Sequence, residues 1–195
     1  MTWDVTWQKW GQIGLYIWIV IVSVTLQVAI LIAMRHPLIC ACGYIELWHS
    51  NPSGPETSQH LTDWYTYTHV IHGFGIYLLI WLIAPRMPFG LQLALATGLE
   101  SAWEVIENTP FVIERYRQSA LAQGYFGDSV INSVSDTVAA MLGFVLARVL
   151  PIWSSVALVI VIELFLGYMI RDNFTLNVIQ LIYPNEIISH WQSGG

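Results

Sequence analysis

The sequence predicts an all-α membrane protein whose chain crosses the bilayer about five times. Of its 195 residues, 55% are hydrophobic and only 10% are charged, whereas a soluble domain carries about 25% charged residues. The run from Ile13 to Met34 contains no charged residue. As a helix this run would reach about 33 Å, enough to cross the hydrocarbon core of a bilayer. We therefore expect a single polytopic membrane domain over residues 1–195.

Apolar segments separated by polar breaks define the expected spans. The first apolar run is longer than the core of a signal peptide, which has about 7–15 residues, so we expect it to remain as a span. Pro85 and Pro88 mark a tight turn between the second and third segments, and Pro151 marks the turn between the fourth and fifth. The predicted spans are residues 12–34, 64–84, 89–108, 128–149 and 151–171.

The other segments are expected to lie outside the bilayer or at its surface. The longest polar connection, residues 35–62, contains prolines and glycines that break helices. Residues 111–121 fit a short interfacial helix. The segment 174–191 is apolar, but Asn177, Gln180, Pro184 and Glu186 interrupt it. We therefore predict a helix lying at the membrane interface there and no sixth span.

The charge balance limits the partners and leaves the orientation open. The net charge is −6 and there is no basic patch, which argues against a nucleic-acid partner. Membrane lipids are the expected surroundings, and a protein partner is expected if the chain is a subunit of a membrane complex. The basic residues divide three to four between the two sides, so the positive-inside rule does not decide the orientation.

Ionisable residues lie inside three consecutive predicted spans, where they are costly. A carboxylate at the centre of a transmembrane helix costs about 2.5–3.5 kcal/mol on an insertion scale. Helical geometry places the residues of each group on one face, within about 60° to 100° of one another. The three groups are His69 and His72; Glu100, Glu104 and Glu107; and Asp128, Asn132 and Asp136.

The simplest packing turns all three polar faces toward one cavity. Three close glutamates cannot all remain ionised without a counter-charge, so they either share protons or surround a cation. Carboxylates and histidines from different helices form the ligand set of metal sites in helical bundles. Iron or manganese suits a carboxylate-rich site, and zinc would use more histidine. The open alternative is that these residues join the helices through hydrogen bonds.

Two further groups of residues are weaker candidates for metal binding. On one continuous helix, His60 and Asp63 would point about 120–180° away from His69. They reach the site only if the helix begins after Asp63 and the preceding segment folds back. Cys40 and Cys42 are too close for a long-range disulfide, and with nearby histidines they offer ligands for copper or zinc.

Several motifs resemble an uncharacterised bacterial family of multi-pass inner-membrane proteins, over roughly residues 35–192. The resemblance implies a bacterial inner-membrane location and no specific activity. Glu56-Thr57 departs from the family's usual Glu-Asn. A shorter likeness, from Glu104 to Gly143, is to VanZ-like membrane proteins. The family motifs are Cys40-Ala41-Cys42-Gly43-Tyr44, Ser58-Gln59-His60, Asp63-Trp64-Tyr65-Thr66, His69-Val70-Ile71-His72-Gly73, Ala102-Trp103-Glu104, Glu107-Asn108-Thr109, the run Gly127 to Asp136, and Ile170-Arg171-Asp172-Asn173.

The sequence thus favours a metal-assisted membrane enzyme that acts on a lipid-like or prenyl-type substrate. Glu104 and Glu107 are the first candidates for ligand or general base, and Asp128 is the third candidate catalytic residue. A divalent ion of iron, manganese or zinc is the expected cofactor. The rival hypotheses are a non-enzymatic subunit or assembly factor of a membrane complex, and a small proton-coupled transporter, although no inverted repeat is evident.

Overall fold

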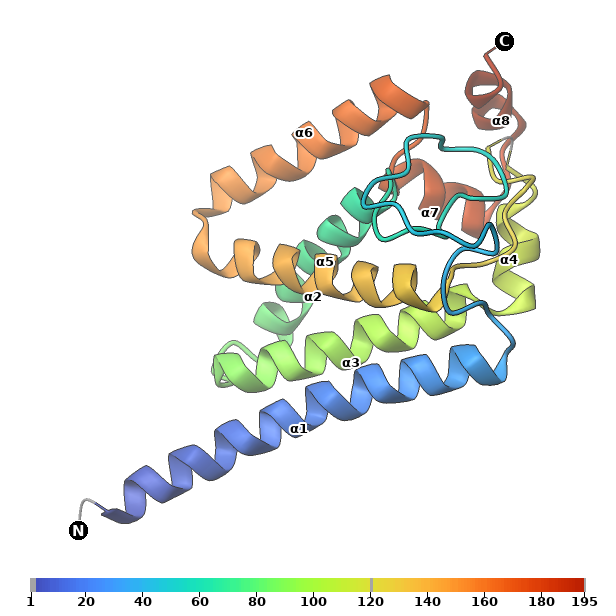
Figure 1. Ribbon diagram of the computed structural model, residues 1–195. Helices are drawn as coiled ribbons and strands as arrows, with labels where there is room; N and C mark the ends of the chain where they lie inside the picture. Colours follow the sequence, from blue (N-terminus) through green and yellow to red (C-terminus); the bar gives the residue numbers. More distant parts are fainter. Residues whose placement is uncertain (1–2, 120, 195) are drawn as a thin grey trace.

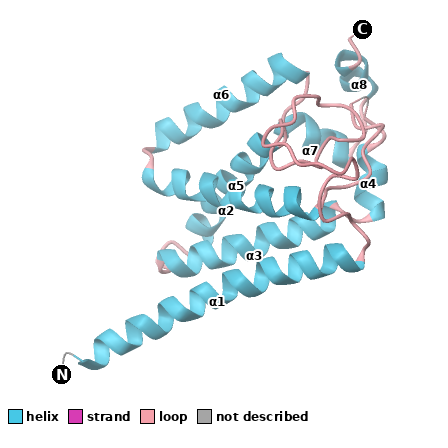
Figure 2. Ribbon diagram, viewed as in Figure 1, coloured by secondary structure: helices cyan, strands magenta, loops and turns pink. Residues whose placement is uncertain are grey.

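The computed structural model describes residues 3–119 and 121–194, and this part of the chain contains helices and loops and no strand (Figure 2). This agrees with the predicted all-α membrane fold. The helices are α1 (Trp3–Ala33), α2 (Thr66–Ile83), α3 (Phe89–Glu107), α4 (Pro110–Tyr116), α5 (Val130–Val149), α6 (Ile152–Ile170), α7 (Phe174–Ile182) and α8 (Glu186–Gln192).

The long helices share one end, at which the loops gather (Figure 1). The ring nitrogens of His36, just beyond α1, lie 3.1 Å from the carbonyl oxygen of Asn108 and 3.0 Å from that of Asp128. The hydroxyl of Tyr65, before α2, donates to Asp172, after α6, at 3.2 Å. The ends of α1, α3 and α6 therefore meet the starts of α2 and α5, and we call this region the loop end.

Among the described residues, four helices are long and apolar enough to cross a membrane: α1, α2, α5 and α6. The remaining predicted span, the third at residues 89–108, corresponds to α3, which has 19 residues but carries three glutamates on one helix. Because α2 leads away from the loop end and α5 starts at it, α3 must return the chain between them (Figure 1). Its carboxylates reduce its hydropathy, although its course matches that of a spanning helix.

Two glycines let α2 and α5 approach closely. A Cβ atom built on Gly73 would fall on the carbonyl oxygen of Ala140, and one built on Gly143 would fall on the carbonyl oxygen of Val70. Small residues at helix crossings are how membrane helices bring their backbones together. This contact fixes the distance between His69 on α2 and the polar face of α5.

The non-helical loop of residues 34–65 covers the start of α5. The amides of Val130 and Ile131 donate to the carbonyl oxygens of Pro37 and Leu38 at 2.8 and 3.1 Å. At the other end of the chain, the interfacial segment predicted over 174–191 divides into α7 and α8. The break lies at Tyr183–Asn185, where Pro184 cannot continue a helix.

Substituting alanine at Gly73 should weaken the packing of α2 against α5. The added methyl group would force the backbones apart, and overpacking of this kind costs about 1–3 kcal/mol. The control is Gly75→Ala on the same helix, where a Cβ meets nothing within 4 Å. Thermal unfolding in detergent should show a lower midpoint for Gly73→Ala alone. Equal midpoints for the two variants would contradict the close contact.

Candidate functional site

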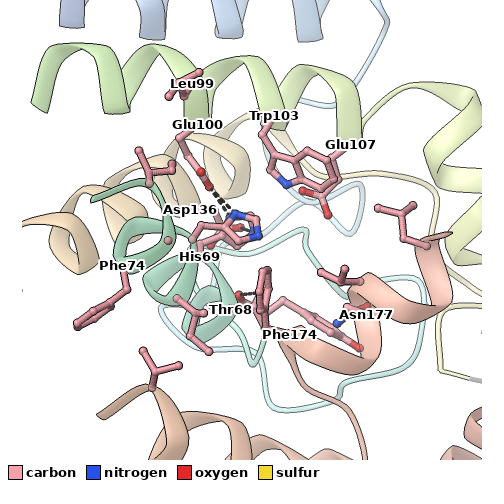
Figure 3. Close-up of a pocket in the computed structure, with 18 of the residues that line it drawn as sticks. Thr68, His69, Phe74, Leu99, Glu100, Trp103, Glu107, Asp136, Phe174 and Asn177 are labelled. Carbon is pink, nitrogen blue, oxygen red and sulfur yellow. Dashed lines mark hydrogen bonds and ion pairs between the residues drawn. The ribbon is translucent and has the colours of Figure 1, made fainter. Parts of the chain in front are cut away.

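A cavity of about 1130 Å³ lies among α2, α3, α5 and α6 and is lined at the loop end by α7. Its walls differ from one end to the other. Near the loop end they include His69, His72, Glu100, Glu107 and Asp136. Glu100, Trp103 and Glu107 extend from α3 toward His69, and Phe174 and Asn177 from α7 lie opposite (Figure 3).

The rest of the cavity wall is mostly apolar, with Ser155 and Arg148 as polar exceptions, and is open toward the helix surface. Leu78 and Leu79 on α2 and Val156 and Ile160 on α6 line it, and these side chains are 46–54% exposed. Apolar side chains on the outside of spanning helices face lipid. The cavity therefore joins a polar end to an apolar groove that opens sideways toward the bilayer.

Two histidines from α2 converge on one carboxylate from α3. The Nδ1 atoms of His69 and His72 lie 2.9 and 3.0 Å from the same oxygen of Glu100. His69 Nδ1 is also 3.2 Å from Glu104. A neutral imidazole has only one N–H, so His69 Nδ1 cannot satisfy both carboxylates with its single proton.

Several buried oxygens at this site have no hydrogen-bond partner. They are Glu104 Oε1, Glu107 Oε2 and Asp136 Oδ1. Buried polar atoms are nearly always paired, so these oxygens are free to bind an ion, a water or a substrate group. Glu104 is fully buried, whereas Glu107 lines the cavity and is half-buried.

The geometry and the charge balance both fit a cation. One ligand atom each from His69, His72 and Glu100 lie within 4.8 Å of one another, as do atoms from His69, Glu104 and Glu107. Metal–ligand bonds of about 2.0–2.2 Å place neighbouring ligand atoms about 3.0–3.5 Å apart, which lies within this limit. Among the described side chains, no lysine or arginine pairs with these glutamates.

The polar residues before and on α5 divide into different roles. Asp136 Oδ2 lies 3.9 Å from His69 Nε2, at the edge of the site. Asp128 was expected on the helix but precedes it, and its oxygens accept from Asn108 Nδ2 at 2.6 Å and Tyr125 Oη at 2.9 Å. Burial raises the pKa of Tyr125 well above its usual range, so it remains a neutral donor. Asp128 is thus occupied as a structural acceptor.

Asn132 also makes its side-chain hydrogen bond outside the candidate site. Its Nδ2 donates to the backbone oxygen of His60 at 2.9 Å, and its Oδ1 is buried without a partner. Asp63 shapes the turn before α2, where its two oxygens accept from the amides of Ser58 and Tyr65 at 2.8 Å. The helix does begin after Asp63, but the returning segment does not bring this carboxylate to His69 and His72.

His60 and the cysteines lie in the loop of residues 34–65, in a separate cluster. His60 Nε2 is 3.1 Å from Glu56. Cys40 and Cys42 are joined to each other by a disulfide, so in this oxidised form they offer no thiolate to a metal. The lower-ranked ligands predicted from the sequence are therefore not part of the site between α2 and α3.

A polar relay that sequence reasoning missed holds Glu104 in place. Ser133 Oγ donates to Glu104 Oε2 at 2.7 Å and accepts from Gln27 Nε2 at 2.8 Å. Thr137 Oγ1 donates to Gln27 Oε1 at 3.0 Å. The available signal was Gln27, a lone amide in the long uncharged run of α1. Buried partners of this kind orient the groups that bind a metal.

Asp172 is a second missed residue of the cavity wall. It is buried and accepts hydrogen bonds from Tyr65, Asn177 and Gln192 at 3.1–3.3 Å. Burial raises the pKa of Asp172 to about 7, although these hydrogen bonds act in the opposite direction. Its charged form is therefore disfavoured in the folded state.

Asp172→Asn should flatten one part of the dependence of stability on pH. Between about pH 4 and about pH 7 the unfolded chain loses the Asp172 proton while the folded protein keeps it. The free energy of unfolding of the wild type should therefore fall as the pH rises through this range. Unfolding titrations in detergent at several pH values measure how the free energy of unfolding changes with pH in the wild type and in Asp172→Asn. An unchanged slope in Asp172→Asn would contradict the raised pKa.

Comparison with known proteins places the chain in a family. A family model described as a protein of unknown function, DUF2585, matches residues 31–194. The chain is 52% identical over 159 residues to a UPF0314 protein of Paracoccus denitrificans, covering 82% of each chain. It is 48% identical over 187 residues to a UPF0314 protein of Brucella anthropi, covering 96% of this chain and 93% of the relative. No solved structure matches. The chain belongs to the uncharacterised bacterial DUF2585 family.

Proposed function

We propose that this protein is a metal-assisted enzyme of the bacterial inner membrane that acts on the head group of a lipid-like substrate. The observation that carries the proposal is the contact between a buried His–Glu cluster and an apolar groove that opens toward the bilayer. The cluster would supply the groups that carry out the reaction, and the groove would bind the apolar part of an amphiphile. The bacterial relatives and the apolar helices support the location.

The metal would be a divalent ion held by His69, His72, Glu100 and Glu104. Two imidazoles and two carboxylates, buried on facing helices, form a ligand set that suits iron, manganese or zinc. A bound dication would also compensate the charge of the glutamates, which otherwise costs several kcal/mol per ion in a low-dielectric interior. Glu104 Oε1 accepts no hydrogen bond and lies 3.2 Å from His69 Nδ1, which supports its role as a ligand beside that histidine.

Glu107 is the preferred general base. It lines the cavity, and its buried Oε2 has no hydrogen-bond partner. When bound, the metal would supply Lewis-acid polarisation and a water of lowered pKa. The chain's own contribution is to hold this carboxylate beside the polar end of the cavity, where a substrate head group would be placed.

The groove defines the substrate class. Its apolar wall extends along α2 from the His69 region to Trp81, a distance of about 18 Å at about 1.5 Å per residue. That length exceeds half of a hydrocarbon core about 30 Å thick. A long-chain amphiphile would place its chain along α2 and α6 and its head group against the histidines and Glu107.

Metal analysis tests the ligand set. Purified wild-type protein, loaded with manganese, iron or zinc and then desalted, should retain about one ion per chain. His72→Ala and Glu104→Gln should lower the affinity for that ion about tenfold or more. The control is Glu114→Gln, since this side chain is 71% exposed and lies outside the cluster. Absence of retained metal in the wild type, with folding confirmed, would overturn the proposal.

Filling the groove should displace the amphiphile without disturbing the metal. Val156 lines the cavity and is 46% exposed, whereas Val161 on the same helix is 60% exposed and lies outside it. Val156→Trp should lower the binding of a fluorescent long-chain amphiphile about tenfold, and Val161→Trp should leave it unchanged. Native mass spectrometry of co-purified lipid gives a second readout. Equal binding by the two variants would contradict the assignment of the groove.

A further inference from the structure

The loop between α1 and α2 carries a disulfide that is poorly suited to be a structural crosslink. Cys40 and Cys42 are separated by two positions in the sequence, with Cα atoms 5.1 Å apart. The entropy that a disulfide removes from the unfolded chain grows with the size of the closed loop. A bond across a single intervening residue therefore restrains the unfolded chain very little, and its presence calls for another explanation.

The two sulfurs differ in access and environment. Cys40 is only 3% exposed, whereas Cys42 is on the surface. The backbone N–H of Cys42 donates to Cys40 Sγ at 3.1 Å. Thiol–disulfide exchange proceeds fastest when one sulfur is accessible to attack and the other leaves as a stabilised thiolate. Here Cys42 is the accessible sulfur and Cys40 is the leaving group.

His60 lies beside this pair of sulfurs. A His60 nitrogen, a Glu56 oxygen and both sulfurs lie within 4.8 Å of one another. His60 Nδ1 accepts the backbone N–H of Glu46 at 3.1 Å, so a neutral His60 carries its proton on Nε2. That proton faces Glu56 Oε2 at 3.1 Å, which makes Nε2 a hydrogen-bond donor and removes it as a metal ligand.

Aromatic contacts hold the His60 ring in place. The ring stacks on His49 with centroids 4.8 Å apart and lies 5.3 Å from the ring of Tyr44. The side chain of His60 is completely buried. In the disulfide form its N–H is bonded to Glu56, so the donor would have to shift from that carboxylate to a developing thiolate on a nearby sulfur. Because the ring is already held in place, this shift loses little entropy, and charge-assisted bonds to a thiolate are strong.

We propose that Cys40–Cys42 is a redox-active site that exchanges with a dithiol of another protein. A thiolate of the partner attacks Cys42 Sγ, the Cys40–Cys42 bond breaks, and its electron pair stays on Cys40 Sγ as a thiolate. The second thiol of the partner then attacks the mixed disulfide and releases Cys42. The partner leaves oxidised by two electrons, and Cys40 and Cys42 are reduced and take up the two protons. The reverse exchange with a protein disulfide restores the site.

The proposal places the loop end on the non-cytoplasmic face of the membrane. Disulfides form and persist in oxidising compartments and are rare in the cytosol. Exposed apolar side chains beside the cysteines, including Tyr44 and Leu47, offer a surface on which a partner protein can rest. This site is independent of the metal site, because none of its residues contributes to the cluster of His69 and Glu100.

Redox titration of the full-length protein in detergent tests the proposal. With glutathione buffers of graded composition and maleimide labelling after acid quenching, folded protein should convert between disulfide and dithiol forms. Protein trapped by acid in intact cells should hold the disulfide. A disulfide that resists every glutathione buffer while the protein is folded would be structural and would overturn the proposal, as would thiols that remain reduced in cells.

A matched pair of variants identifies the attacked sulfur. Cys40→Ser should form a stable mixed disulfide with glutathione at Cys42, whereas Cys42→Ser should react at least about tenfold more slowly at the buried Cys40. His60→Leu should slow reduction by dithiothreitol about tenfold, and His60→Gln, which keeps an N–H donor, should restore most of the rate. Equal reactivity of the two single-cysteine variants would contradict the assignment. Metal content should be unchanged in Cys42→Ser, which separates this test from that of the metal site.

Discussion

The compensation of buried carboxylates is the constraint on which this structure depends. Glu100, Glu104 and Asp136 are almost completely buried between apolar helices, and ions in such surroundings require a partner of opposite charge or a donor. Two imidazoles from α2 supply part of that compensation at Glu100. The unpaired oxygens of Glu104, Glu107 and Asp136 show that the described side chains leave the remainder unmet. The proposed divalent cation would supply this compensation at Glu104 and Glu107, which cluster with His69.

The packing of the helices follows from the need to bring these groups together. Gly73 lies one residue after His72, so the close contact of α2 with α5 sets the position of both histidines. On the opposite side, Gln27 reaches from α1 to Ser133, which in turn binds Glu104. This contact ties α1, which also packs along α3, to the centre of the bundle. Removing Gln27 would leave Ser133 free to rotate and Glu104 without its oriented donor.

Helical periodicity was enough to predict the shared faces of α2 and α3, because three- and four-residue spacings place side chains on one side of a helix. The same rule did not place Asp128, since the helix begins at Val130 and the preceding backbone is extended. Ser133 was not among the residues predicted for the polar face, yet it holds Glu104. Contacts between distant segments, such as Asn108 with Asp128, depend on loop paths that periodicity does not contain. The low hydropathy of α3 gives no sign that its glutamates acquire partners, because those partners lie on other helices and meet α3 only after folding.

The two polar centres share a structural element even though they share no residue. Leu38, two positions before Cys40, accepts the amide of Ile131 in the first turn of α5. The next residue, Asn132, donates to the backbone of His60, and Ser133 after it donates to Glu104. One turn of helix therefore connects the disulfide loop, the His60 cluster and the buried glutamate. Because these hydrogen bonds, of 2.7–3.1 Å, come from three consecutive residues of one helix, the loop and the site are held in a fixed relation. The position of α5 is thus determined at the loop end by the disulfide loop and inside the bundle by Glu104.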